Sequence, residues 1–120
     1  METMDKALLC LGIIKERKAL DPIVFEMGEL TSITDYFLIA SGNSSRQVQA
    51  IARHLTRRMR EEGLRAYGVE GEQEGQWILM DYGDVVIHIF YQPVREFYDL
   101  EGLWIEAPRI ELDEDRMQIS

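Results

Sequence analysis

Two aspartates give this chain its most obvious opportunity for metal chemistry. Asp81 and Asp84 are close enough in sequence to share a divalent cation, for which carboxylate oxygens are good ligands. They flank a two-residue turn, however, where Asp is common because its side chain hydrogen-bonds to the local backbone. No third acidic residue or histidine is obviously placed beside them. We therefore expect a turn here, and no metal site.

A second candidate is the segment of residues 41–46, which joins an expected strand to the start of an expected helix. The free amides at a helix N-terminus favour anions, so a phosphate is conceivable there. The segment lacks the lysine and glycine spacing of a P-loop and the glycines of a dinucleotide-binding motif. Ser44 and Gln47 have the spacing of a capping box instead. A structural turn with a helix cap is the favoured interpretation.

Nucleophilic and acid–base catalysis have little support. Cys10 lies in an apolar helical pattern without a nearby basic partner, which is typical of an inert core thiol. His54 and His88 are isolated, and no Ser/His/Asp or Cys/His arrangement is present. The sequence predicts a protein that is not an enzyme and binds no cofactor.

Four arginines fall within one narrow arc of an expected helix: Arg46, Arg53, Arg57 and Arg60. We favour a solvated helix face whose arginines interact with nearby carboxylates over a face that contacts RNA phosphate. The formal net charge of −9 at pH 7 also argues against a protein that binds nucleic acid mainly by neutralising phosphates. RNA contact is therefore at most secondary, and a basic protein is the more natural partner.

Aromatic and acidic residues are interleaved between residues 77 and 104. They are Trp77, Tyr82, Tyr91, Phe97, Tyr98 and Trp104, among Asp81, Asp84, Glu96, Asp99 and Glu101. Trp and Tyr are preferred anchors at protein interfaces. Core packing accounts for some of the rings, but a core has little use for so many acids. The pattern predicts a binding surface for a partner that presents Lys and Arg.

These residues require a scaffold, and the sequence predicts a single domain of the α/β (α+β) class. Helices are predicted over residues 4–18, from Ser44 to Gly63 and, as one short turn, over 93–98; strands are predicted over 23–27, 36–40, 64–69, 77–80 and 85–91. The order α-β-β-α-β-β-β-short α indicates a mixed, roughly five-stranded sheet with two main helices. If both main helices pack on one face, the other face keeps apolar side chains with little to cover them, which usually marks a partner site.

The chain is expected to form one domain over residues 1–110, followed by an acidic, flexible tail over residues 111–120. No apolar run approaches the roughly 20 residues that span a bilayer, and the first residues do not resemble a signal peptide. The single cysteine fits a reducing compartment. We expect a cytoplasmic protein.

Two long stretches resemble the Iojap-like family, the bacterial ribosomal silencing factors. They are SITDYFLIASGNSSRQVQAIA (residues 32–52) and WILMDYGDVVIHIFYQPVREFYDLEGLW (residues 77–104), and the resemblance covers roughly residues 21–108. It implies a nucleotidyltransferase-like topology without that catalysis. It also implies a protein that binds large-subunit ribosomal protein uL-fourteen, sterically blocks association of the ribosomal subunits, and represses translation under nutrient limitation. When free, such a protein is expected to form a homodimer.

The resemblance assigns partner binding to eight positions: Trp77, Asp81, Tyr82, His88, Tyr98, Leu100, Glu101 and Trp104. The aromatic and acidic pattern points to the same region. Two alternatives stay open. One is a divergent nucleotidyltransferase-fold protein that binds nucleotide through residues 41–46, with a metal at Asp81 and Asp84. The other is an RNA-binding module that uses the arginine row.

Overall fold

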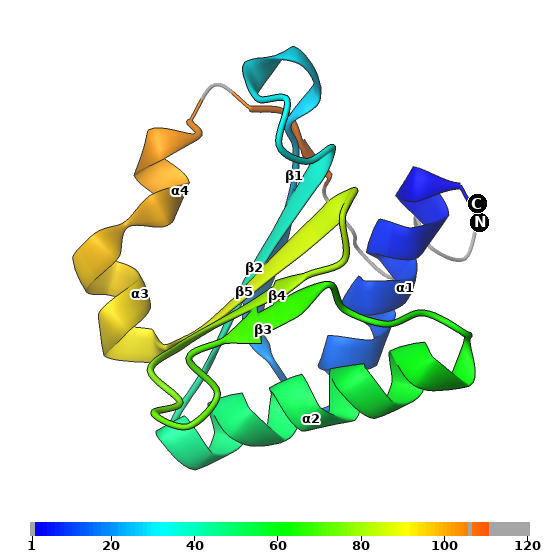
Figure 1. The fold of residues 1–120 in the computed structure, drawn as a ribbon. Coiled ribbons are helices and arrows are strands. Elements are labelled where there is room, and N and C mark those ends of the chain that lie inside the picture. The colour runs from blue at the N-terminus through cyan, green and yellow to red at the C-terminus, as the bar shows by residue number, and fades with distance from the viewer. Residues whose placement is uncertain (1, 106, 111–120) are drawn as a thin grey trace.

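A mixed sheet with helices against both faces forms the centre of the computed structural model, which describes residues 2–105 and 107–110 (Figure 1). The elements in chain order are α1 (Thr3–Glu16), β1 (Leu20–Glu26), the 3-10 turn η1 (Gly28–Leu30), β2 (Tyr36–Gly42), α2 (Ser45–Glu61), β3 (Gly68–Glu70), β4 (Trp77–Asp81), β5 (Val85–Tyr91), α3 (Gln92–Tyr98), α4 (Leu100–Leu103) and β6 (Arg109–Ile110). The predicted acidic tail, residues 111–120, lies outside the described residues.

The sheet has the strand order β3-β4-β5-β2-β1-β6. The two central strands, β2 and β5, run parallel, and every other neighbouring pair is antiparallel. Nearly all residues of these two strands are buried. Central strands of a sheet that is covered on both faces are apolar on both sides. This explains why apolar and polar residues do not alternate in the sequences of β2 and β5.

The main helices α1 and α2 cover one face of the sheet (Figure 1). The apolar stripe predicted for the second helix is buried there: Val48, Ile51, Ala52, Leu55 and Met59. Cys10 is also buried, and its thiol lies 3.8 Å from the sulfur of Met59. Burial raises the pKa of the Cys10 thiol to about 12, so it packs as a small apolar group and stays protonated at neutral pH.

The opposite face carries a smaller core cluster, which the short helices α3 and α4 partly cover: Phe25, Met27, Ile39, Phe90 and Ala107. Pro93 lies in the first turn of α3, where its fixed φ favours the helix and its missing N–H costs nothing. Asp99 separates α3 from α4 with a left-handed φ of 45°. The resulting bent pair, which we call the α3–α4 arm (residues 92–103), runs along this face on the side opposite α1 and α2 (Figure 1).

Three predicted elements need correction. The described residues form six strands rather than about five, because β6 adds to β1 at one edge. The strand predicted over residues 64–69 is shorter, since β3 pairs with β4 only from Gly68. Residues 100–103 form a helical turn where the sequence predicted no helix. A two-residue strand and a single helical turn are too short to show a period in the sequence.

Among the described residues, no helix has both the length and the apolar character needed to cross a bilayer.

Candidate protein-binding surface

Strand register places three of the predicted partner-facing residues on one face of the sheet. On β4, Ile78 and Met80 belong to the core beneath α1 and α2. Because side chains alternate along a strand, Trp77 and Asp81 lie on the other face, the one beside the α3–α4 arm. Leu79 pairs with His88 on β5, so His88 shares that face.

Four more predicted residues lie on the arm or directly after it: Tyr98, Leu100, Glu101 and Trp104. Aromatic rings connect the arm to the sheet in one continuous chain. The Trp77 ring lies 5.1 Å from Tyr98 and 5.9 Å from His88 between centroids. Phe37 then lies 5.4 Å from His88 and 5.7 Å from Trp104. We call these five rings the aromatic face. The fold thus places seven of the eight predicted residues on this face of the sheet, on the arm or directly after it.

Tyr82 is the exception. Its side chain is only 1% exposed and lies in the core beneath α1 and α2. Burial raises the pKa of its phenol to about 12. Turn residues are usually exposed, but this one follows β4 and turns its ring into the interior, while Lys6 of α1 donates to its carbonyl oxygen at 2.7 Å. In this fold the Tyr82 ring is unavailable to a partner.

His88 is held as a neutral ring inside the aromatic face. It is 5% exposed, and the indole N–H of Trp77 donates to its Nδ1 at 3.0 Å. Burial lowers the pKa of His88 from 6.5 to about 4. The Nε2 of His88 and the Nε1 of Trp104 are buried without a hydrogen-bond partner among the described residues. Since Nδ1 accepts, Nε2 carries the proton, so both orphan atoms are N–H donors.

We expect His88 to make folding stability sensitive to mild acid. The folded state keeps the ring neutral while the unfolded chain takes up a proton, so this contribution is present above pH 6.5 and is lost as pH falls toward 4. At about pH 4 the wild type should have lost about 3 kcal/mol more unfolding free energy than His88→Gln, relative to about pH 7. Urea titrations across this pH range measure the difference. Parallel pH curves for the two proteins would contradict the expectation.

The two turn aspartates, Asp81 and Asp84, accept hydrogen bonds from different parts of the protein. Asp81 accepts a hydrogen bond from the backbone N–H of Gly83 at 2.7 Å, as turn aspartates commonly do. Asp84 accepts from Lys6 at 2.7 Å and from Thr3 at 3.0 Å, on the α1 side of the molecule. Partial burial would raise the pKa of Asp84, but these two hydrogen bonds outweigh it and lower the pKa. Across the described residues, no group of three or more potential ligands gathers around a metal-sized site.

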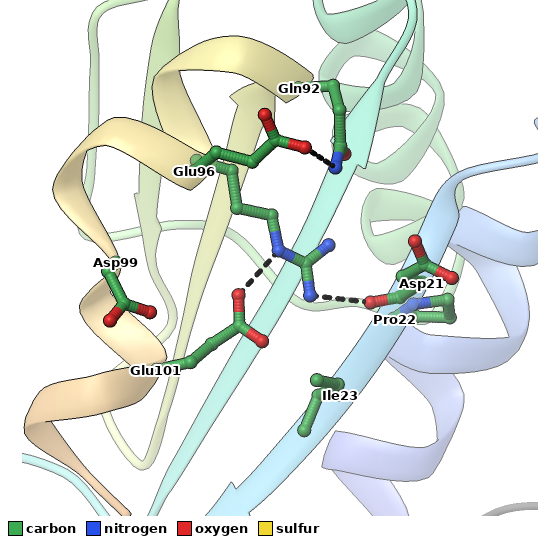
Figure 2. Close-up of a pocket in the computed structure, with 8 residues that line it drawn as sticks. Asp21, Pro22, Ile23, Gln92, Glu96, Asp99 and Glu101 are labelled. Atoms are coloured by element: carbon green, nitrogen blue, oxygen red, sulfur yellow. Dashed lines mark hydrogen bonds and ion pairs between the residues drawn. The ribbon is translucent and has the colours of Figure 1, made fainter.

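Arg95, which is not among the residues predicted from the sequence, anchors the arm. It is buried, and its Nε donates to Glu101 at 2.7 Å. One of its terminal nitrogens donates to the carbonyl of Asp21 at 2.8 Å (Figure 2), and the other donates to the carbonyl of Leu20 at 3.2 Å and to the hydroxyl of Ser41 at 3.1 Å. The guanidinium thus ties α4 to β1 and β2. An isolated arginine in a short helix carries no sequence signal for this role.

Polar groups of residues 41–46, the candidate phosphate-binding segment, are engaged in hydrogen bonds within the protein. Ser41 contacts Arg95 and Gln92. Ser44 caps α2 by accepting from the Gln47 backbone N–H at 3.0 Å, as the capping-box spacing predicted. The reciprocal bond comes from the N–H of Asn43 rather than that of Ser44. These polar groups serve the turn and the arm.

An acidic hollow of about 660 Å³ opens beside this network. Its lining consists of Asp21, Pro22, Ile23, Gln92, Arg95, Glu96, Asp99 and Glu101. The carboxylates of Glu96, Asp99 and Glu101 come from the arm, and Asp21 comes from β1 (Figure 2). Four carboxylates against one guanidinium make the hollow favourable for a positively charged group.

The most exposed apolar side chains of the arm were not among the eight predicted residues. Phe97 is 82% exposed, and Leu103 and Ile105, which follows the arm, are exposed to a similar degree. Tyr98 is 54% exposed. Phe97 belonged to the aromatic set in the sequence, and Leu103 lies in the second stretch that carries the family resemblance. In helices this short, however, no periodicity separates exposed from buried positions. Large exposed apolar side chains beside an acidic hollow are suited to a protein contact.

Known proteins with the same fold and related sequence identify this arrangement. A family model described as "Ribosomal silencing factor during starvation" matches residues 1–120. The ribosomal silencing factor of Bacillus subtilis is 43% identical over 98 residues, which cover 82% of this chain and 83% of that protein. The one from Halalkalibacterium halodurans is 38% identical over 113 residues, covering 94% and 97%.

The fold has a close experimental counterpart. A crystal structure of a protein from Chromobacterium violaceum superimposes with a TM-score of 0.84 at 36% identity, covering 87% of each chain. It supports a mixed α/β single domain, as the sequence predicted. Sequence and fold agree with the resemblance of residues 32–52 and 77–104 noted above. This chain therefore belongs to the family of ribosomal silencing factors, the Iojap-like proteins, which regulate translation.

Proposed function

We propose that this protein binds large-subunit ribosomal protein uL-fourteen through the aromatic face and the α3–α4 arm, and that it thereby blocks association of the two ribosomal subunits. Translation would then fall under nutrient limitation. The observation that carries the proposal is the exposure of Tyr98 and Phe97 on the arm beside an acidic hollow. Exposed aromatic anchors with carboxylates around them suit a basic ribosomal protein.

The chemistry of the surface matches such a partner in two ways. The carboxylates of the hollow can pair with Lys or Arg, which speeds encounter and selects orientation. The exposed rings offer apolar area and faces for cation–π contact. A contact of about 800 Å² per partner would make the complex stable.

The proposed block needs no catalysis. The folded chain measures 34 × 33 × 30 Å along its principal axes. A rigid body of this size, held on the joining face of the large subunit, cannot be accommodated where the two subunits touch. Silencing then depends only on occupancy of the large subunit.

Sedimentation of purified subunits tests the proposal. The protein should travel with large subunits, not with small ones, and should reduce the fraction of joined ribosomes in proportion to its occupancy. Large subunits reconstituted without uL-fourteen are the control, and they should not retain the protein. Equal capture by both kinds of large subunit would contradict the proposed partner.

We also propose that the free protein is a homodimer in the cytoplasm, paired through the same aromatic face. An isologous contact buries the same patch on both copies, so the exposed arm residues would be covered in both. Light scattering should then give twice the chain mass. Added uL-fourteen should replace dimers with a one-to-one complex, because the two partners compete for one surface.

A further inference from the structure

We propose that a groove between α2 and β3 binds the phosphate backbone of ribosomal RNA. This groove, the arginine groove, has a volume of about 680 Å³ and is lined by Arg53, Thr56, Arg57, Arg60, Glu61, Val69 and Glu72. It lies on the α2 side of the sheet, away from the α3–α4 arm (Figure 1). The choice of RNA rests on the proposed ribosomal role.

The arginines form a row along the solvent side of α2. Arg46, Arg53, Arg57 and Arg60 are all exposed. At about 100° per residue they fall within an arc of about 60°, and at about 1.5 Å per residue the row is about 21 Å long. A row of this length and direction can follow a nucleic acid backbone over several phosphates.

Carboxylates of the protein do not neutralise the row within residues 2–105 and 107–110. The arginine of α2 that forms ion pairs is Arg58, which contacts Glu16 at 2.5 Å and Glu61 at 3.2 Å. Arg58 lies outside the arc, on the flank that faces α1. Arg57 contacts the imidazole of His54 instead of an acid. The row is solvated, as the sequence predicted, and Glu61 and Glu72 line the same groove, but among the described residues neither carboxylate forms an ion pair with an arginine of the row.

The groove itself has the chemistry of an anion site. Three guanidinium groups face two carboxylates there, and one of those carboxylates, Glu61, is already engaged by Arg58. Guanidinium groups present paired N–H donors in a planar fork that matches two phosphate oxygens. The hydroxyl of Thr56 is a further donor at the wall, although it now bonds to the carbonyl of Ala52.

RNA is favoured over an acidic protein because the arginines form a regular line about 21 Å long, which suits the repeating phosphates of a nucleic acid backbone. In Figure 1, α2 and the α3–α4 arm lie on opposite sides of the sheet, so the groove on α2 and the aromatic face can both be occupied at once. Arginine contacts to phosphate would then add affinity without reading sequence.

The salt dependence of binding gives the expected magnitude. Three phosphate contacts make affinity fall about 20- to 40-fold between about 50 and 200 mM salt, through release of counterions. Loss of the three contacts should reduce the slope of log affinity against log salt by about two to three. At about 50 mM salt it should weaken binding to large subunits by at least about tenfold.

The test compares two variants that each lose three positive charges. In the first, Arg53, Arg57 and Arg60 become Gln, which has nearly the same helix propensity as Arg. In the control, Lys15, Arg17 and Lys18 become Gln; they are exposed at the end of α1, on the other flank of α2. Thermal unfolding verifies both folds. Binding is measured to naked large-subunit ribosomal RNA, to purified large subunits and to isolated uL-fourteen.

The groove variant should bind RNA and large subunits more weakly and with a shallower salt slope than the control, while both bind isolated uL-fourteen like the wild type. Equal binding of the two variants to RNA and to subunits would overturn the inference. So would a defect on subunits with none on naked RNA, which would assign the groove to an acidic protein. Failure of the wild type to bind uL-fourteen would contradict the proposed function instead, and the RNA measurement would still decide the groove.

Discussion

Replacement of Arg95 by Met is expected to lower the free energy of unfolding by about 3 kcal/mol. The guanidinium is buried and donates to Glu101, to Ser41 and to two backbone carbonyls of β1. Without it, these acceptors lose their donor, and Glu101 becomes an unpaired charge. Breaking a buried ion pair costs about 3–5 kcal/mol, and the lower end applies because Glu101 is partly exposed and can be rehydrated.

Urea unfolding followed by tryptophan fluorescence measures this loss. Arg65→Met is the matched control, since Arg65 is exposed and such surface changes stay within about 0.5 kcal/mol. Arg95→Lys keeps the charge but cannot reach four acceptors with one ammonium, so it should fall between the two. If Arg95→Met proved as stable as Arg65→Met, the anchoring role assigned to Arg95 would be wrong. Because the arm carries Tyr98, the variant should also bind large subunits less well.

Truncation of Tyr98 to Ala is expected to weaken binding to uL-fourteen by about 30-fold, which corresponds to about 2 kcal/mol for an aromatic anchor. The Tyr98 ring is half exposed and lies against Trp77 and Phe97, so it presents a rigid apolar surface at the edge of the aromatic face. Stability should change less than binding does, because 54% of the side chain is already exposed to water. Titration calorimetry with isolated uL-fourteen measures the effect, and subunit joining should recover in parallel.

Tyr67→Ala is the matched control for this change. Tyr67 is 82% exposed, and its ring lies against Gly83, at the end of the β4–β5 hairpin opposite Trp77. Tyr67→Ala removes the same side chain at the end of the hairpin away from Trp77 and Tyr98, so binding should stay within about twofold of the wild type. If Tyr67→Ala weakened binding as strongly as Tyr98→Ala, the contact surface would have to be placed elsewhere on the chain.

The sequence alone determined the elements that depend on local pattern. The stripe of α2 and the apolar run of β5 predicted their structures, because periodicity and β-branched composition are properties of neighbouring residues. The cap of α2 was equally local, since Ser44 accepts from Gln47 three residues later. Long stretches of matching residues also predicted the family, which the comparisons confirmed.

Only the tertiary structure decided which residues meet across the chain. The parallel pairing of β2 with β5 aligns Phe37 with Val86 and Ile39 with His88, and that register assembles the aromatic face. The same packing buried Tyr82, which local pattern had placed at the surface, and joined Arg95 to carbonyls more than 70 residues earlier. Contacts of this kind are set by how whole elements pack against one another, and that packing leaves no periodic trace in any one stretch of sequence.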